Sequence, residues 1–359
     1  MTMRCPNCRA TYADDARFCT KDGGKLVPVA PLAPPVGPSV SPSVSPSVSP
    51  SVSPSVSPSV SPSVVGGEVT LADLGDQSKM VGKILDGAYR IERKLGEGGM
   101  SYVYLGEERA TGARYAIKIL APNLAKDATA MARLRREALL GGKLAHPNVC
   151  HIIRLGETAG GLVYVVMPFV QGEILSDRNY RVRQTSLADT VTFVTQIAAG
   201  LQVAHNLTIV HRDLKPENIM ICRDAGGREY AVIMDFGLAK AREAGAELQK
   251  LTSTGIVLGT PEFMSPEQLR GKPLDGRTDI YSLALMAFEM LTGKLPFEGK
   301  NQQEMMIARL RAEPTPIRQL RSELPSGVEA ALLKAMARAA DDRFATAPAF
   351  AEALRRAVR

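Results

Sequence analysis

The sequence lacks the features of a secreted or membrane-spanning protein. Its first residues are polar and include cysteine, so they do not form the apolar run of a signal peptide. No uninterrupted apolar run reaches the ~18 residues that a bilayer-spanning helix needs. The five cysteines are an odd number with three near the start, which does not suit a disulfide framework. These absences predict a soluble, cytoplasmic chain that contacts no membrane.

A concentrated block of basic residues is also missing. The 44 Lys and Arg residues exceed the 37 Asp and Glu residues by seven, but they are spread along the chain. Net charge alone is weak evidence for nucleic-acid binding, so we do not expect a nucleic-acid partner. A surplus of positive charge fits acidic or phosphorylated partner surfaces equally well. The 359 residues, 45% of them apolar, leave room for two or three units with a sizeable core.

Residues 1–26 carry the clustered cysteines. Cys5 and Cys8 stand two residues apart, and Cys19 follows ten residues later with Asp22 behind it. Zinc prefers four ligands and accepts carboxylate oxygen beside sulfur. A segment of this length has no hydrophobic core of its own, so it needs a bound metal ion or another cross-link to fold. The segment resembles a small zinc ribbon in which Asp22 replaces the fourth cysteine. Asp22 is either that ligand or only a turn residue, and the alternative to Zn²⁺ binding is a disordered tail with spare thiols.

Residues 27–80 form a linker by composition. A Pro-Ser-Val-Ser repeat runs from 38 to 63, and its prolines are too frequent for a helix or a central strand. We predict an extended, polyproline-like spacer. The alternatives are a plain linker or a set of Ser-Pro phosphorylation sites.

The stretch from His211 to Asn218 carries the chemistry. Pro216 lacks an N–H, so the stretch cannot be one face of a helix. Asp213 can accept a proton from a hydroxyl, Lys215 can pair with a phosphate, and Asn218 can offer an oxygen to a metal ion. The stretch resembles the catalytic loop of protein kinases. A charged surface loop that matches by chance is the alternative.

The resemblance implies an α+β, bilobal protein-kinase-like fold over residues 81–359. The small lobe, residues 85–170, is an antiparallel sheet with one helix, and the large lobe, residues 171–355, is mainly helical. ATP binds between the lobes.

A glycine-rich turn, predicted between two strands from residue 88 on, is the first nucleotide-binding motif. Glycines let backbone N–H groups approach phosphate oxygens, although a lone glycine-rich loop is also typical of ordinary hairpins. Ser101 stands where many kinases have a third glycine. By resemblance the nucleotide-binding residues are Leu95, Gly96, Glu97, Gly98, Gly99, Met100, Ser101, Tyr102, Val103, Ala116, Lys118, Met167, Pro168 and Val170.

Four of these positions have specific implied roles. Lys118, in the predicted strand 115–120, resembles the lysine that pairs with the α- and β-phosphates; a snorkelling surface lysine is the alternative. Met167 fills the gatekeeper position. The adenine then meets the Pro168 carbonyl and the Val170 N–H, because proline keeps its carbonyl acceptor.

A helix predicted over 128–144 carries Glu137, the candidate partner of Lys118. A solvated glutamate on a basic helix is the other reading.

The large lobe is predicted to hold a helix over 187–205 and a hairpin of strands 219–221 and 231–234. Asp235 follows the hairpin in an Asp-Phe-Gly motif. By resemblance, Asp235 and Asn218 hold the magnesium (or manganese) ions that bridge the nucleotide phosphates.

Residues 235–267 resemble an activation segment. A phosphorylated Thr252, Ser253 or Thr254 is expected to bind Arg212, and plain loop hydroxyls are the alternative. Thr260 resembles the residue that contacts the catalytic Asp and Lys of serine/threonine kinases.

Further motifs complete the set. Glu267 is expected to be buried, and a buried carboxylate needs a partner, which by resemblance is Arg343. Asp279 resembles the carboxylate that braces the catalytic-loop backbone. Ser265 replaces the alanine of the usual Ala-Pro-Glu motif, and Ala284 stands where the family usually has glycine.

The chain is therefore identified as a bacterial eukaryotic-like (Hanks-type) serine/threonine protein kinase that phosphorylates protein substrates and itself. A homodimer through the small lobes is plausible by family. The alternative is a catalytically weak scaffold that acts through the zinc-ribbon-like segment; it predicts loss of Lys118, Asp213 or Asp235, and all three are present.

Overall fold

The computed structural model describes residues 3–4, 11–12, 27–28, 67–98, 101–121, 128–236 and 261–358. The chain divides into two units, Met1–Ser61 and Pro62–Arg359. In the first unit three short strands pair antiparallel in the order β2-β1-β3: β1 (Met3–Arg4), β2 (Thr11–Tyr12) and β3 (Val27–Pro28). The predicted zinc ligands lie outside the described residues, so the zinc site stays a prediction.

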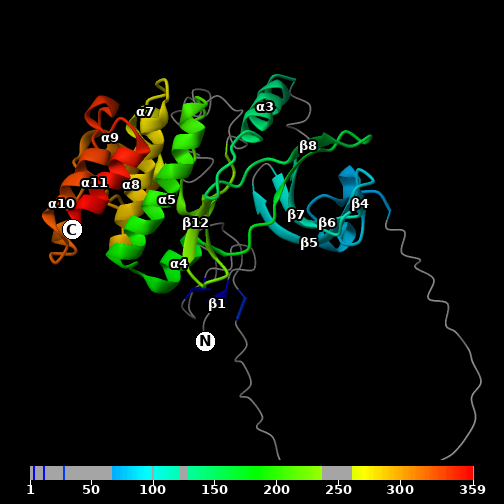
Figure 1. Ribbon diagram of the computed structural model, residues 1–359, viewed down its shortest axis with the longest axis horizontal. Helices are drawn as coiled ribbons and strands as arrows, with labels where there is room; N and C mark the ends of the chain where they lie inside the picture. The colour runs from blue at the N-terminus through cyan, green and yellow to red at the C-terminus, as the bar shows by residue number, and fades with distance from the viewer. Residues whose placement is uncertain are drawn as a thin grey trace, which may run out of the picture. The chain divides into compact units, whose positions relative to one another are not determined.

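The small lobe is a six-stranded antiparallel sheet in the order β4-β5-β6-β7-β9-β8, with helix α3 beside it (Figure 1). The elements are β4 (Ile84–Leu85), β5 (Tyr89–Gly98), β6 (Ser101–Glu108), β7 (Arg114–Leu120), α3 (Ala128–Gly141), β8 (Arg154–Glu157) and β9 (Val163–Pro168). The predicted strand-turn-strand, the strand over 115–120 and the helix over 128–144 are confirmed. Ile117 and Ile119 of β7 alternate with Lys118 and are fully buried on the face away from the nucleotide cleft.

The small lobe begins earlier than the sequence indicated. Within residues 67–80, which the sequence assigned to the linker, the structure contains η1 (Leu71–Asp73) and α1 (Gln77–Met80). Val69 and Met80 are buried in the small-lobe core, and Met80 has no exposed surface. The segment is fastened by Asp73, which accepts hydrogen bonds from Thr70 and pairs with Lys83 at 2.7 Å. The hydrogen bond from Lys83 is the largest cause that lowers the pKa of Asp73 to about 2.

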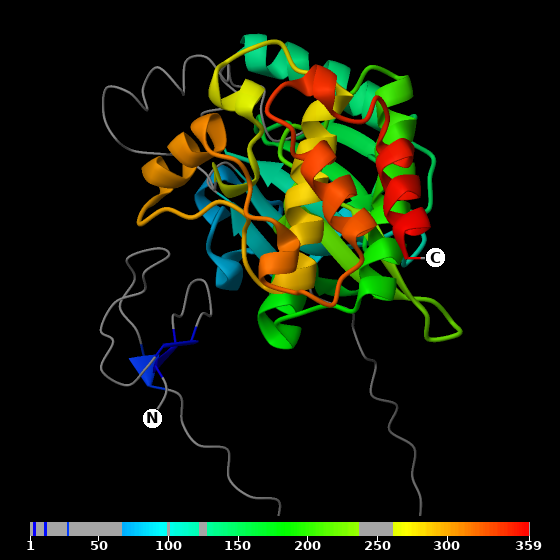
Figure 2. The ribbon, with the colours of Figure 1, turned by 90° about the vertical axis from the view of Figure 1, so that its left-hand side faces the viewer.

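The large lobe is mainly helical, as expected (Figure 2). Its helices are α4 (Leu175–Val182), α5 (Leu187–Asn206), α7 (Pro266–Leu269), α8 (Gly276–Thr292), α9 (Gln302–Arg311), α10 (Ser326–Ala335) and α11 (Ala347–Ala357), with the short turns η2 (Pro216–Asn218), η3 (Pro261–Phe263), η4 (Ile317–Gln319) and η5 (Ala340–Asp342). Three strands, β10 (Glu173–Ile174), β11 (Ile219–Arg223) and β12 (Glu229–Ile233), form its sheet. The predicted hairpin and the helix over 187–205 are confirmed.

Helix α8 is the centre of the large lobe because it is buried on every side. Asp275 caps its N-terminus by accepting from the Arg277 N–H, and Gly293 ends it with a left-handed φ of 70°. Helix α5 lies against α8 and α11. Among the described helices, α5 is the one long and apolar enough to cross a membrane by composition. Since one side of it, including Phe193 and Ile197, is buried in the large-lobe core, it reads as a core helix.

Candidate active site

A cleft of about 900 Å³ lies between the two lobes, lined from the β5–β6 hairpin, the end of β9 and the strands of the large lobe. Eight sequence-predicted residues line it: Leu95, Gly96, Val103, Ala116, Met167, Val170, Asn218 and Asp235. The sequence reasoning missed Met220 and Met234, which add apolar surface, and four carboxylates at the cleft, Glu92, Glu173, Asp177 and Glu217. The carboxylates could not be found by motif, because ordinary surface residues look the same.

The glycine turn is only partly directed at the cleft. Glu97 pairs with Lys94 at 2.6 Å. The ring of Tyr102 lies 5.3 Å from the Lys94 Nζ and fills the space that a Cβ on Gly75 of the early segment would need. Neither side chain lines the cleft, so the predicted nucleotide binding by these two residues stays a prediction that concerns their backbone. Ser101 and Pro168 do not line it either, and the surroundings of Gly98, Gly99 and Met100 lie outside what the structure describes.

At the hinge, the Pro168 carbonyl faces the thiol of Cys150, with 3.8 Å between the sulfur and the oxygen. A carbonyl oxygen has two lone pairs, so this weak contact leaves a second acceptor position for an adenine amino group. Met167 is buried beside Ala116, its partner in the β7–β9 register. Adenine binding through the Pro168 carbonyl and the Val170 N–H stays a prediction.

Lys118 pairs with Asp235, which lines the cleft. The Lys118 Nζ lies 2.9 Å from an Asp235 carboxylate oxygen, and the lysine side chain is 9% exposed. Asp235 has a left-handed φ of 56°, a conformation that Asp tolerates better than most residues. The side chain of Glu137 lies outside the described residues, so its pairing with Lys118 stays a prediction.

The catalytic-loop side chains converge on Asp213. The Lys215 Nζ lies 3.2 Å from its carboxylate, and the Asn218 amide nitrogen donates to the Asp213 carbonyl oxygen at 2.7 Å and to its carboxylate at 3.3 Å. Since the amide nitrogen is turned toward Asp213, the Asn218 Oδ1 is left as an acceptor in the cleft. A carboxamide oxygen and the Asp235 carboxylate are the hard oxygen donors that Mg²⁺ or Mn²⁺ takes, so the residues present fit such an ion.

The loop backbone is held by Asp279 of α8. This carboxylate has no exposed surface and accepts from the backbone N–H groups of His211 and Arg212 at 2.9 and 3.0 Å. It also contacts the His205 Nε2 at 2.7 Å. The expectation that Asp279 braces the loop is confirmed. Arg212 has a left-handed φ of 66°, and its side chain is exposed.

His211 connects the catalytic loop to Asp235. Its Nε2 lies 3.0 Å from the Met234 carbonyl oxygen, and its ring stacks edge-on against Phe236 at 4.8 Å. The Met234 N–H in turn donates to the Asn218 carbonyl at 2.8 Å. These contacts tie the loop that carries Asp213 to the segment that carries Asp235.

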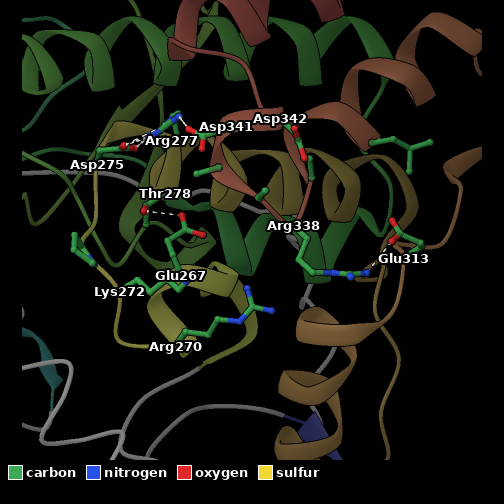
Figure 3. Close-up of a pocket in the computed structure, with 15 residues that line it drawn as sticks. Glu267, Arg270, Lys272, Asp275, Arg277, Thr278, Glu313, Arg338, Asp341 and Asp342 are labelled. Carbon is green, nitrogen blue, oxygen red and sulfur yellow. Dashed lines mark hydrogen bonds and ion pairs between the residues drawn. The ribbon is translucent and has the colours of Figure 1, made fainter.

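The predicted pairing of Glu267 with Arg343 is confirmed. The guanidinium donates to both carboxylate oxygens at 2.7 Å, and its side chain has no exposed surface. Burial by itself raises the pKa of Glu267, but the hydrogen bonds and charge of Arg343 outweigh it and hold this pKa below its usual value. Figure 3 shows Glu267 and its second donor, Thr278, at 2.8 Å, in a pocket lined by the neighbouring Arg277 and Asp341 pair.

Helix α7 links this ion pair to the catalytic loop. The Gln268 amide donates to the Arg212 carbonyl oxygen at 2.7 Å, and Ser265 caps the helix by accepting from the Gln268 N–H. Ser265 in place of the usual alanine therefore supplies a cap. The activation-segment residues Thr252, Ser253, Thr254 and Thr260 lie outside the described residues.

The two-lobed fold, the cleft and the Lys118–Asp235–Asp213 arrangement define a protein kinase domain. The chain belongs to that family, because the protein kinase domain model matches residues 89–350. It is 34% identical over 277 residues to serine/threonine-protein kinase pkn3 of Myxococcus xanthus, covering 77% of this chain and 51% of pkn3. It is 40% identical over 234 residues to pkn2 of the same organism, covering 65% of this chain and 28% of pkn2.

Solved structures agree with this assignment. The crystal structure of the Mycobacterium tuberculosis PknI kinase domain matches with a TM-score of 0.61 and 25% identity, over 77% of this chain and 99% of that chain. The expected kinase-like fold is thus confirmed. The chain spans about half or less of the length of the curated relatives it matches.

Proposed function

We propose that this protein is a serine/threonine protein kinase that transfers the γ-phosphoryl group of ATP to hydroxyls of protein substrates. The observations that carry the proposal are two contacts, Lys118 with Asp235 at 2.9 Å and Asn218 with Asp213 at 3.3 Å, of which Asp235 and Asn218 line the same interlobe cleft. Lys215, two residues after Asp213, supports specificity for Ser and Thr. By resemblance, serine/threonine kinases carry a lysine at this position, whereas tyrosine kinases generally do not. The relatives named serine/threonine-protein kinases support the same reading.

The chemistry follows from the positions of the charges. The oxygen of a substrate hydroxyl forms a bond to the γ-phosphorus, and the bond from that phosphorus to the β,γ-bridging oxygen breaks, so that ADP leaves. Asp213 orients the hydroxyl and accepts its proton, while Lys215 and Lys118 offset phosphate charge. Such transfer depends on positioning and charge neutralisation more than on covalent help. Asn218 and Asp235 would hold Mg²⁺ or Mn²⁺, which neutralises the phosphate oxygens when bound.

Finer parts of the proposal rest on the sequence. Autophosphorylation at Thr252, Ser253 or Thr254 would place a phosphate for Arg212, whose exposed guanidinium is available beside the catalytic loop. The same proposal includes a contact between Thr260 and Asp213 and a Zn²⁺ ion bound by residues 1–26. It also includes a homodimer through the small lobes and a cytoplasmic location. The scaffold alternative has less support, because Lys118, Asp213 and Asp235 are not only present but also assembled.

The test is transfer of radiolabel from ATP with magnesium, comparing the wild type with Asp213→Asn, followed by phosphosite mapping. We expect label on Thr252 or Thr254 that the variant loses. Equal labelling of both proteins would show that another base or a contaminant is responsible. Folded wild-type protein that binds ATP without transferring label would favour the scaffold.

A further inference from the structure

Residues 70–76, which precede the small-lobe sheet, form a strap across the hairpin of β5 and β6. The strap is anchored on both sides. Before it, the Val69 N–H donates to the Ile84 carbonyl oxygen of β4 at 2.9 Å. After it, Met80 is buried in the small-lobe core with no exposed surface. The strap therefore cannot leave the sheet unless these anchors are also lost.

The β5–β6 hairpin presents one face to the nucleotide cleft and the other to the strap. Successive side chains of a strand point to opposite faces of the sheet. On β6, Val103 and Leu105 line the cleft. Tyr102 and Tyr104 point to the opposite face, where they pack in one core cluster with Leu74 of the strap. The strap thus supports the outer face of a strand whose inner face lines the cleft.

Gly75 is the residue of the strap that meets the hairpin most closely. Its N–H donates to the Tyr104 hydroxyl at 3.3 Å, and its carbonyl oxygen accepts from the Lys94 Nζ at 3.3 Å. The φ of Gly75 is 85°, a left-handed conformation that glycine adopts without strain. Atoms of the Tyr102 ring lie 3.2 to 3.3 Å from the place of a Cβ on Gly75. Any larger residue would therefore strain the strap and press on the hairpin.

We propose that the strap positions the β5–β6 hairpin for ATP binding, with Gly75 as the positioning residue. From Arg93 on, β5 pairs only with β6 among the strands that the structure describes, so this part of β5 is a sheet edge. The strap gives this edge the support that a further strand would give. The glycine-rich turn joins β5 to β6, so a displaced hairpin should hold ATP more weakly. This consequence for ATP rests on the proposed function.

The test compares Gly75→Ala with Gly82→Ala in the full chain. The two glycines have left-handed φ values of 85° and 84°, so both variants carry similar backbone strain. Nothing lies within 4 Å of a Cβ on Gly82, so only Gly75→Ala presses on the hairpin. The first readout is amide hydrogen exchange without nucleotide. We expect β5 and β6 to exchange at least about fivefold faster in Gly75→Ala than in Gly82→Ala, and β9 to exchange alike in both.

The second readout is the Kd of a fluorescent ATP analogue with Mg²⁺. We expect this Kd to be roughly three- to tenfold higher in Gly75→Ala than in Gly82→Ala, and KM for ATP to rise with it while kcat stays within about twofold. Tyr104→Phe removes the hydroxyl that accepts from the Gly75 N–H and keeps the ring. It should move both readouts in the same direction by a smaller factor, and it remains a test if Gly75→Ala does not fold.

Three results would overturn the proposal. The first is equal exchange of β5 and β6 in the two glycine variants. The second is an equal acceleration of β5, β6 and β9, which would mean that the strap only stabilises the lobe as a whole. The third is faster hairpin exchange with an unchanged Kd. Both readouts need no phosphoryl transfer, so a wild type that binds ATP but transfers no label would refute the kinase function and leave the role of the strap standing.

Discussion

Lys118 of β7 and Asp235, which follows β12, form an ion pair of 2.9 Å that joins the two lobes. Both groups have another partner in the proposed reaction, since the lysine would meet phosphate and the carboxylate would meet a metal ion. Pairing keeps both charges compensated before the nucleotide arrives. Nucleotide binding is therefore an exchange of partners between two groups already held in place.

Replacing Lys118 tests this exchange. We expect Lys118→Met to lower kcat/KM for phosphoryl transfer by roughly 10²–10³-fold, the usual loss when one preorganised charge donor is removed. Steady-state radiolabel transfer measures it. Lys79→Met changes a lysine whose side chain is 59% exposed and should leave the rate unchanged. A Lys118→Met protein as active as the Lys79 control would show that Lys118 does not act on the phosphates.

Asp279 offers a prediction about positioning. Asp279→Ala removes the acceptor for the backbone N–H groups of His211 and Arg212 and leaves them buried without a partner. We expect a loss of about 2–4 kcal/mol in the free energy of unfolding. Urea denaturation measures this loss. The exposed Asp275→Asn serves as the control and should cost less than about 1 kcal/mol.

The kinetics of Asp279→Ala distinguish a role of Asp279 in positioning the catalytic loop from a role in stability alone. Since Asp279 fixes the backbone that carries Asp213, kcat should fall more than KM for ATP changes, at a temperature where the variant is fully folded. A folded Asp279→Ala protein with wild-type kcat would contradict the bracing role.

The sequence predicted the parts of the site that depend on motif and spacing. The catalytic loop, Asp279 and the Glu267–Arg343 pair are predicted by resemblance to the family's motifs, and the structure places each bracing contact as expected. Side-chain direction was not predictable in the same way. Glu97 and Tyr102 both turn toward Lys94, whose ammonium group attracts the carboxylate of one and the ring of the other. No local sequence pattern reveals this attraction.

The early segment was missed for a related reason. Residues 69–80 are too short and too mixed in composition to show a sustained helical or strand periodicity. The burial of Val69 and Met80 depends on the β5–β7 surface that lies far along the chain. Long-range packing of this kind is visible only in three dimensions.

Met80 provides the test of that packing. Met80 has no exposed surface, so Met80→Ala should leave a cavity and destabilise the small lobe by about 2–4 kcal/mol. Val81, which is 46% exposed, is the neighbouring control, and Val81→Ala should cost less than about 0.5 kcal/mol. Thermal unfolding of both variants measures the difference. Equal melting temperatures would mean that residues 67–80 are a linker after all.

The Glu267–Arg343 pair should behave as a buried unit. Arg343→Ala leaves the carboxylate largely buried and uncompensated, and we expect a loss of about 3–5 kcal/mol. Adding Glu267→Ala should restore part of that loss, and a double-mutant cycle by urea denaturation measures the coupling. Additive losses would show that the two side chains act independently.

The pH dependence of this pair follows from the lowered pKa of Glu267. A carboxyl whose pKa is lower in the folded state stabilises the protein above its unfolded pKa. That contribution is lost as the pH falls through the folded value. The wild type should therefore lose more stability than the double variant between pH 5 and pH 3.

Glu289 of α8 predicts the opposite dependence. Burial is the main cause that raises its pKa to about 7, against a hydrogen bond from Asn179 and helped by the negative charges of Glu217 and Glu262. In the pH window from ~4.3, the unfolded value, to about 7, the folded protein holds a proton that the unfolded chain releases. Stability from this group is therefore present at pH 4 and falls as the pH rises toward 7.

Replacing Glu289 with glutamine removes that titration. The Asn179 Nδ2 donates to Glu289 at 3.1 Å, while the Asn179 Oδ1 is buried with no hydrogen-bond partner in the described structure. The amide of Glu289→Gln can donate to that oxygen, as the protonated carboxyl can. We expect the variant to match the wild type near pH 5 and to exceed it by about 1–3 kcal/mol at pH 8. Urea denaturation at the two pH values measures the difference, with the exposed Glu298→Gln as the control. A stability difference between Glu289→Gln and the wild type that stays constant from pH 5 to pH 8 would show that Glu289 is already ionised in the folded protein.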